Sequence, residues 1–143
     1  MQLARALRIS PGAIVALTGG GGKTTVLFRL AAELAPLGPV ITTTTTRIFA
    51  AQIALAPLHF SVADAAHLPD LPRLLAEHPH ILLTGPPDSS DSGKAPGLSL
   101  ETFAALLEQT AGLRPTILIE ADGSRMRPFK APAAHEPVVP PQT

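Results

Sequence analysis

The chain has 143 residues, of which 45% are hydrophobic and 15% are charged, and its mean hydropathy is +0.27. This length and apolar content suffice for one domain with a buried core, which excludes disorder for most of the chain. Its 11 basic and 11 acidic side chains cancel, aromatic residues make up 3%, and cysteine, Trp and Tyr are absent. These features exclude a charged or base-stacking nucleic-acid surface, electrostatic membrane binding, disulfides and thiol chemistry, and they suit a cytoplasmic protein.

The N-terminal segment MQLARALRIS is basic, but Pro11 and Gly12 interrupt the chain before any long apolar run can form. We therefore expect neither a signal peptide nor a membrane span. The 16 prolines amount to roughly twice the usual share of about 5%.

Short apolar runs alternate along the chain with segments of helical periodicity. The predicted strands are Ala13–Leu17, Val40–Thr44, His59–Val62, His80–Thr84 and Thr116–Ile119. The predicted helices run from Lys23 to near Gly38, over Leu71–Glu77, and from the N-cap Ser99 to about Thr110. This alternation predicts an α/β fold, a three-layer P-loop-like parallel sheet flanked by helices, with ligands at the carboxyl ends of its strands.

Turn residues dominate two segments. The stretch GPPDSSDSGKAPG, residues 85–97, consists of turn residues with no apolar content to bury, so it is predicted to be a surface loop in which Lys94 is a loop lysine. From Arg125 onward five prolines occur without periodicity, which predicts extended chain. The expected division is an α/β nucleotide-binding domain over residues 1–124 and a Pro-rich tail over residues 125–143.

The most informative motif is TGGGGKTT, residues 18–25, between a predicted strand and a predicted helix. Glycines let successive backbone N–H groups converge on an anion, and a helix N-terminus adds its positive end. We expect Lys23 to neutralise the outer phosphates and the Thr24 hydroxyl to bind Mg²⁺. The residues predicted to bind the nucleotide here are Gly19, Gly20, Gly21, Gly22, Lys23, Thr24 and Thr25.

The glycine loop is shorter than the full pattern GxxxxGK[ST], which would require glycine where the chain has Leu17. Its spacing is similar to that of the Mur-type amide ligases and other shortened P-loops. A flexible glycine linker is the alternative interpretation, and the Lys-Thr-Thr sequence at a strand-to-helix junction favours phosphate binding.

A run of threonines, Thr42 to Thr46, ends the second predicted strand. Its hydroxyls are expected to bind phosphate or a magnesium-bound water, with Thr43, Thr44 and Thr45 as the predicted contacts. The alternative is that threonine occurs there because it favours strands.

An acidic turn, IEADGS, follows the last predicted strand and contains Glu120 and Asp122. Residues two apart in extended chain point to the same side, so one acid is expected to hold Mg²⁺ through water and the other to orient a nucleophilic water. Both acids and Lys23 are the predicted catalytic residues, and both acids and Thr24 are the predicted metal ligands. An Asp-Gly turn without function is the alternative.

Charged residues elsewhere carry weaker signals. The basic tail around Arg125 and Arg127 is interpreted either as a charge clamp on the phosphates or as a solvated stretch. His78 and His80 flank Pro79, and a His-x-His pattern without a third ligand indicates a surface turn rather than a metal site.

Four segments resemble the selenium-dependent hydroxylase accessory proteins of the YqeC type: GGGGKTT, TTTTTR, GKAPGLS and, most specifically, IEADGSRMRPFKAPAAHEPVVP. The resemblance covers nearly the whole chain. By position it implies as motif residues Gly19, Gly22, Lys23, Thr24, Thr43 to Thr45, Glu120, Asp122, Gly123, Lys130, His135 and Glu136. Lys130 and His135 thereby join the predicted nucleotide contacts. Similar proteins continue past PPQT, so we expect a further C-terminal part.

The resemblance also implies a P-loop protein that acts in the maturation of selenium-dependent molybdenum hydroxylases, with such an enzyme or its cofactor-maturation proteins as partner. The leading hypothesis is therefore a Mg²⁺-dependent accessory protein that binds ATP or another NTP and uses hydrolysis or group transfer. One alternative is a non-catalytic, nucleotide-dependent interaction or chaperone module that delivers a cofactor. Another is a fragment of a Mur-type amide ligase.

Overall fold

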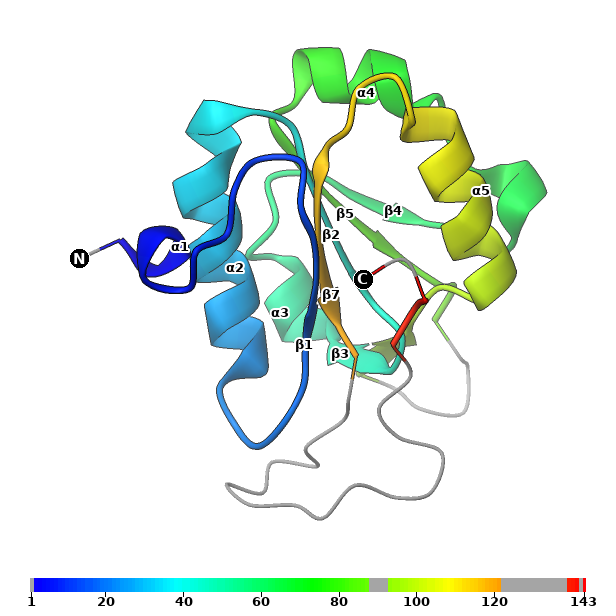
Figure 1. Ribbon diagram of the computed structural model, residues 1–143. Helices are drawn as coiled ribbons and strands as arrows, with labels where there is room; N and C mark the ends of the chain where they lie inside the picture. The colour runs from blue at the N-terminus through cyan, green and yellow to red at the C-terminus, as the bar shows by residue number, and fades with distance from the viewer. Residues whose placement is uncertain (1, 88–92, 122–138, 142) are drawn as a thin grey trace.

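The computed structural model describes residues 2–87, 93–121, 139–141 and 143, which Figure 1 draws in colour. The strands are β1 (Ile14–Leu17), β2 (Val40–Thr44), β3 (Arg47–Phe49), β4 (His59–Ser61), β5 (His80–Thr84), β6 (Lys94–Pro96) and β7 (Thr116–Glu120). The α-helices are α1 (Leu3–Ala6), α2 (Lys23–Leu34), α3 (Ala50–Ile53), α4 (Leu71–Glu77) and α5 (Leu100–Thr110). The segments Ala35–Leu37, directly after α2, and Ala65–His67, between β4 and α4, are short 3₁₀ helices.

The central sheet has five strands in the order β1-β7-β2-β5-β4, and all its neighbouring strands are parallel. Every residue of β2, β5 and β7 is buried, which explains why these strands are continuous runs without polar alternation. The expected α/β fold with a parallel sheet flanked by helices is confirmed.

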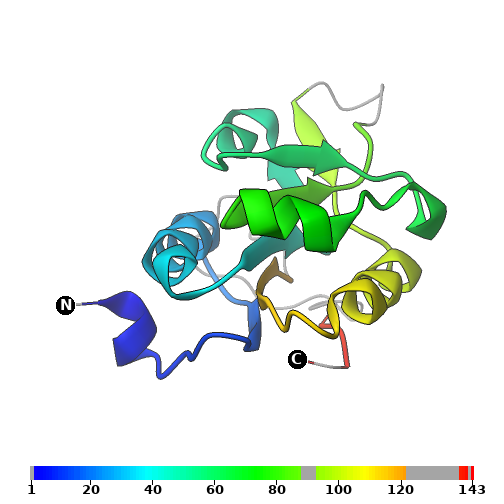
Figure 2. The ribbon, with the colours of Figure 1, turned by 90° about the horizontal axis from the view of Figure 1, so that it is seen from above.

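Helices cover both faces of this sheet. Successive side chains of a strand point to opposite sides, so the buried strands present apolar side chains on both faces. On one face Val40 and Leu118 pack with Leu27 and Leu30 of α2. On the other face the core includes the following side chains from β2, β7, α4 and α5: Ile41, Ile117, Leu71, Phe103 and Leu106. Figure 2 shows the resulting three layers, with α2 and α5 on opposite sides of the sheet.

The helix bounds follow local signals in the sequence. Ser99 caps α5, since its Oγ accepts a hydrogen bond from the Thr102 backbone N–H at 3.0 Å. Asp70 caps α4 in the same way through the Arg73 N–H at 3.2 Å. The helix α2 ends at Leu34 and tightens into a 3₁₀ turn before Gly38. The three predicted helices are confirmed.

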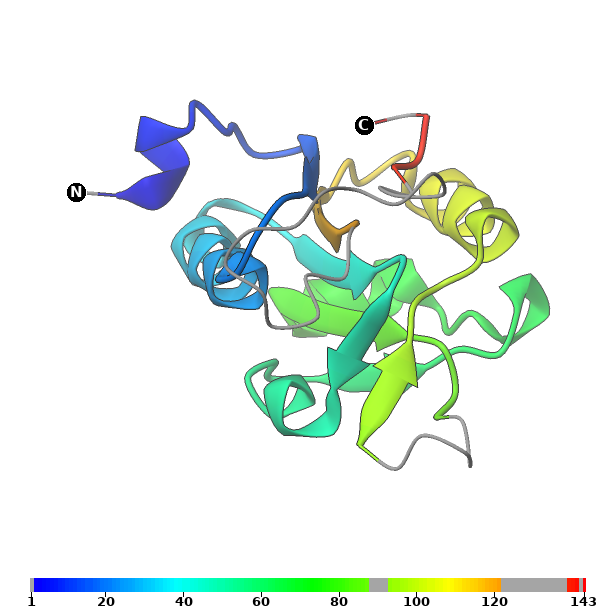
Figure 3. The same cartoon turned by 90° about the horizontal axis from the view of Figure 1, so that it is seen from below.

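The prediction of a surface loop over residues 85–97 was wrong for its last part. Residues Lys94–Pro96 form β6, which pairs with β3 in an antiparallel two-stranded sheet. Ile48 and Ala95 face inward and pack against Leu82 of the main sheet. In the view from below (Figure 3), β3 and β6 lie side by side beyond the ends of β2 and β5. Lys94 is therefore a strand residue.

Two further findings concern the helices. Neither α1 nor α3 was predicted, because each is only 4 residues long, too short to show helical periodicity. None of the helices among the described residues is long and apolar enough to cross a membrane.

Candidate functional site

The glycine loop connects β1 to α2, as the sequence predicts. Gly19 and Gly22 have positive φ values of 107° and 90°, a backbone conformation that favours glycine. A Cβ atom added at Gly19, Gly21 or Gly22 would meet nothing within 4 Å. Conformation rather than lack of space therefore requires glycine at Gly19 and Gly22.

The side chain of Lys23 turns back toward the loop that precedes it. Its Nζ donates hydrogen bonds to the carbonyl oxygens of Gly19 at 2.8 Å and Gly20 at 2.9 Å. Only 7% of Lys23 is exposed, and the carbonyl oxygens compensate part of the cost of burying its charge. The ammonium group is thus held at the loop, where the sequence predicts it.

Glu120 lies beside the start of α2, although it is 96 positions away from Thr24 in the sequence. The hydroxyl of Thr24 donates a hydrogen bond of 2.7 Å to Oε2 of Glu120. The two meet because β7 is the neighbour of β1, with Leu17 and Glu120 paired in register. A hydroxyl that donates its proton to a carboxylate keeps its lone pairs for another ligand.

The hydroxyls of the threonine run do not point toward a common site. Thr42 Oγ1 lies 2.9 Å from His80 Nε2, and Thr44 Oγ1 donates to the Glu120 carbonyl oxygen at 2.9 Å. Thr43 points to the opposite face, and among the described residues its buried hydroxyl has no hydrogen-bond partner. Thr45 contributes its backbone N–H, which donates to the Glu120 carbonyl oxygen at 3.1 Å.

Strand order separates the threonine run from the glycine loop. The strand β7 lies between β1 and β2, so Glu120 stands between Thr24 on one side and Thr44 on the other. The structure brings together Lys23, Thr24, Glu120 and Thr44, while Thr25 lies exposed on the first turn of α2. Asp122, Gly123, Lys130, His135 and Glu136 lie outside the described residues, so their roles stay predictions.

The expectation of a surface turn around His80 was wrong, because His80 begins β5 and is buried. Burial lowers the pKa of its imidazole from 6.5 to about 4. The imidazole is therefore neutral at pH 7 and bonds the Thr42 hydroxyl. Burial also lowers the pKa of His59, whose Nε2 lies 2.8 Å from Thr84 Oγ1. Within the described residues no three His, Cys, Asp or Glu side chains gather as a metal cluster.

Sequence reasoning missed the segment that packs against the threonine run. Gly97 contacts Thr44 so closely that an added Cβ would lie 2.6 Å from the Thr44 carbonyl carbon. The Leu98 N–H donates to the Thr44 carbonyl oxygen at 3.0 Å. The available signal was the glycine in GKAPGLS, since a strand-flanking glycine often marks a close backbone approach.

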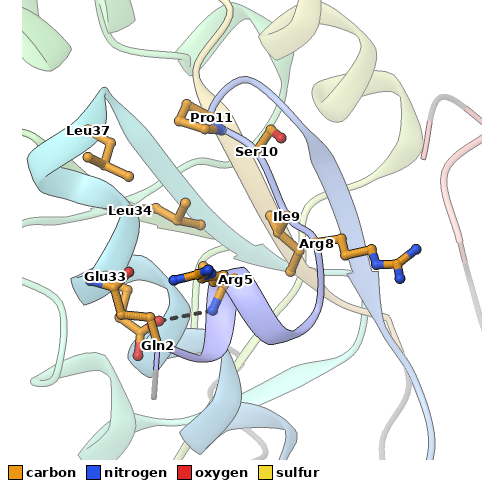
Figure 4. Close-up of a pocket in the computed structure, with 10 residues that line it drawn as sticks. Gln2, Arg5, Arg8, Ile9, Ser10, Pro11, Glu33, Leu34 and Leu37 are labelled. Carbon is orange, nitrogen blue, oxygen red and sulfur yellow. Dashed lines mark hydrogen bonds between the residues drawn. The ribbon is translucent and has the colours of Figure 1, made fainter.

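A pocket of about 370 Å³ lies between α1 and the C-terminal end of α2 (Figure 4). Its lining residues are Gln2, Ala4, Arg5, Arg8, Ile9, Ser10, Pro11, Glu33, Leu34 and Leu37. The Ala4 N–H donates to Glu33 at 2.9 Å, and this bond, with help from Arg29, holds the Glu33 pKa below its usual value. The pocket is at the opposite end of α2 from Lys23 and contains none of the predicted site residues.

Two comparisons with known proteins identify the same family. A family model described as YqeC protein matches residues 15–143. The Escherichia coli K12 protein named "Uncharacterized protein YqeC" is 37% identical to this chain in a match that covers 89% of this chain and 47% of that protein. The chain thus spans about half the length of this curated relative. No solved structure matches the chain.

Proposed function

The chain belongs to the YqeC protein family, and we propose that it binds a nucleoside triphosphate together with Mg²⁺, with ATP as the expected nucleotide. The observation that carries this proposal is the hydrogen bond of 2.7 Å from the Thr24 hydroxyl to the Glu120 carboxylate. It joins the residue after the loop lysine to an acid at the carboxyl end of a neighbouring parallel strand. Ligands of α/β proteins bind at that edge of the sheet.

Phosphate binding is supported by the groups around the glycine loop. The loop leads into α2, a helix of 12 residues, whose first backbone N–H groups and positive dipole end attract anions. Lys23 adds a full positive charge and is held at the loop by Gly19 and Gly20. An outer phosphate at the loop would accept hydrogen bonds from these N–H groups and from the ammonium group.

Magnesium binding is supported by the chemistry of the donor set. Mg²⁺ prefers oxygen ligands and is usually held by one or two protein oxygens together with phosphate oxygens. Thr24 and Glu120 supply a hydroxyl and a carboxylate in contact, so these residues fit the ion. When bound, Mg²⁺ would neutralise charge on the phosphate oxygens. Asp122 is the second carboxylate that the sequence predicts for this site.

Titration calorimetry with ATP and Mg²⁺ tests the proposal. The unmodified chain is expected to bind, and Lys23→Met is expected to weaken the affinity by about tenfold or more, since a hydrogen bond to a charged group contributes about 1.5–3 kcal/mol. Methionine is an unbranched, uncharged side chain of similar length, so the substitution removes the ammonium group with little change in shape.

The matched control is Lys94→Met, because Lys94 lies on β6 with its Nζ 4.8 Å from the centre of the Phe49 ring. This variant is expected to bind ATP with unchanged affinity. The proposal fails if the unmodified chain binds no nucleoside triphosphate in the presence of Mg²⁺. The assignment of Lys23 fails if the two variants bind equally well.

The biological role that we propose is that of an accessory factor in the maturation of selenium-dependent molybdenum hydroxylases. It rests on the resemblance carried by the glycine loop, the threonine run and the IEADGS segment. The partner would then be such an enzyme or one of its maturation proteins. Co-purification of the chain with a selenium-dependent hydroxylase, compared in the presence and absence of ATP, tests this role.

A catalytic protein and a nucleotide-dependent interaction module differ in phosphate release. If the chain hydrolyses ATP, release of phosphate is expected to fall in Glu120→Gln, because the amide carries no charge for a metal or water to pair with. A module without catalysis would give slow release that this substitution leaves unchanged.

A further inference from the structure

We propose that Thr44 is a positioning residue, which fixes the carboxyl end of β7 and through it the Glu120 carboxylate, and that it is not a ligand of phosphate or metal. The inference rests on the proposed function, since Glu120 is the acid assigned there to Mg²⁺. It changes the role that the sequence predicts for the threonine run.

The first support is the pair of hydrogen bonds received by the Glu120 carbonyl oxygen. Thr44 Oγ1 donates to this oxygen at 2.9 Å, and the Thr45 backbone N–H donates to it at 3.1 Å. A carbonyl oxygen has two lone pairs, so both are used. Thr44 and Glu120 are also the last residues paired in register between β2 and β7. These bonds therefore fix the peptide at the point where β7 leaves the sheet.

The second support is that the Thr44 hydroxyl is saturated by the protein. It donates its proton to Glu120, accepts a hydrogen bond from the Thr46 backbone N–H at 3.0 Å and lies 3.1 Å from Thr46 Oγ1. A hydroxyl offers one donor and two acceptor positions. Only 1% of Thr44 is exposed, so its contacts are with the chain and none is left for a ligand.

The third support is the segment that closes over Thr44 from the other side. The Leu98 N–H donates to the Thr44 carbonyl oxygen at 3.0 Å, and the Gly97 N–H donates to the Thr46 carbonyl oxygen at 2.6 Å. Gly97 permits this approach because it has no Cβ atom. The end of β2 is thus hydrogen-bonded to β7 on one side and to the Gly97–Leu98 segment on the other. Rigid support of this kind keeps a site residue in position.

The contacts form one connected path from this segment to the glycine loop. The Leu98 N–H donates to the Thr44 carbonyl oxygen, and the Thr44 hydroxyl donates to the Glu120 carbonyl oxygen. The Glu120 carboxylate in turn accepts a hydrogen bond from the Thr24 hydroxyl. Loss of the Thr44 hydroxyl would leave the phosphate-binding groups of the loop in place while removing one of the two hydrogen bonds that fix the Glu120 peptide. The effect is therefore expected in the Mg²⁺ dependence of binding rather than in binding of the nucleotide itself.

The test compares ATP affinity with Mg²⁺ and with EDTA for Thr44→Val, Thr44→Ser and Thr116→Val. With Mg²⁺, Thr44→Val is expected to bind ATP about tenfold more weakly, which corresponds to the loss of one hydrogen bond of about 1.4 kcal/mol. In EDTA its affinity for ATP is expected to equal that of the unmodified chain. Thr44→Ser keeps the hydroxyl and is expected to behave as the unmodified chain. Thr116→Val is the matched control, because the buried Thr116 hydroxyl accepts from the Gly12 N–H at 2.9 Å at the other end of β7.

If Thr44→Val lost the same ATP affinity with Mg²⁺ as in EDTA, the inference would be overturned, because the hydroxyl would then contact the nucleotide. A loss no larger than that of Thr116→Val would also overturn it. Amide hydrogen exchange of Thr45 gives a readout that needs no nucleotide: it is expected to be faster in Thr44→Val than in Thr116→Val. If the chain binds no ATP, the proposed function fails, and unchanged Thr45 exchange would separately refute positioning by Thr44.

Discussion

Thr24 and Glu120 are joined by a hydrogen bond of 2.7 Å between a hydroxyl at the start of α2 and a carboxylate at the end of β7. The contact exists because β1 and β7 are parallel neighbours, so their carboxyl ends reach the same edge of the sheet. Glu120 is only 8% exposed, so its charge lies largely out of bulk water, where it interacts strongly with any nearby ion.

Replacement of Glu120 by glutamine is expected to lower ATP affinity with Mg²⁺ but not in EDTA. With Mg²⁺ the affinity falls, since the metal loses a charged ligand; in EDTA it stays equal or rises, since a negative charge near the phosphates is removed. The glutamine oxygen still accepts the Thr24 hydrogen bond, so the fold is retained. Calorimetry under both conditions measures the effect, and equal losses in both would show that Glu120 has no metal-specific role.

A second prediction concerns the close contact at Gly97. Gly97→Ala is expected to lower the free energy of unfolding by about 3 kcal/mol, because the new methyl group would overlap the Thr44 backbone. Gly112→Ala is the matched control, since a Cβ there meets nothing within 4 Å, and its change is expected to stay within about 0.5 kcal/mol. Urea denaturation compares the two, and similar values for both variants would contradict the prediction.

The central strands could be predicted from the sequence because their environment leaves a simple pattern. The predicted bounds of Val40–Thr44 and His80–Thr84 match β2 and β5. A strand buried on both faces has to be apolar or internally satisfied at every position, so it forms a continuous run between turn residues.

The strands β3 and β6 could not be predicted, because their formation depends on contacts distant in the sequence. Arg47–Phe49 pairs with Lys94–Pro96, and only Ile48 and Ala95 bury apolar side chains. A run of three residues gives no measurable alternation, and Pro96 at the end of β6 argues against a strand when the segment is considered alone.

The site itself was predictable in part. The carboxyl ends of parallel strands share one edge, so the approach of Glu120 to the glycine loop follows from the fold class. The partners of the threonine hydroxyls depend on strand order, which the sequence does not encode locally: β7 lies between β1 and β2. For this reason Thr44 bonds Glu120 and Thr42 bonds His80.

A third prediction concerns Thr43, whose buried hydroxyl has no hydrogen-bond partner among the described residues. Thr43→Val is expected to raise the free energy of unfolding by about 1 kcal/mol, because it replaces an unsatisfied polar atom by a methyl group of similar size. Thr42→Val is expected to do the opposite, since it leaves His80 Nε2 without its partner. Urea denaturation measures both. A loss of stability in Thr43→Val would mean that the hydroxyl has a partner in solution.

The last prediction concerns pH and His80. Burial lowers the pKa of its imidazole from 6.5 to about 4, so the unfolded chain takes up a proton at a higher pH than the folded chain does. The contribution of neutral His80 to the free energy of unfolding is therefore fully present above pH 6.5. It is lost as the pH falls toward 4, and the total loss is about 3 kcal/mol. The lowered pKa of His59 acts in the same direction.

The variant His80→Gln isolates this effect from the other titrating groups, because the glutamine amide can still form a hydrogen bond with the Thr42 hydroxyl and does not titrate. Urea denaturation of both proteins at pH values between 7 and 4 gives the difference in their unfolding free energies. The unmodified chain is expected to lose about 3 kcal/mol more than the variant over this range. Parallel pH profiles would mean that His80 becomes protonated in the folded chain as readily as in the unfolded chain, which is incompatible with its burial beneath α2 beside Phe28.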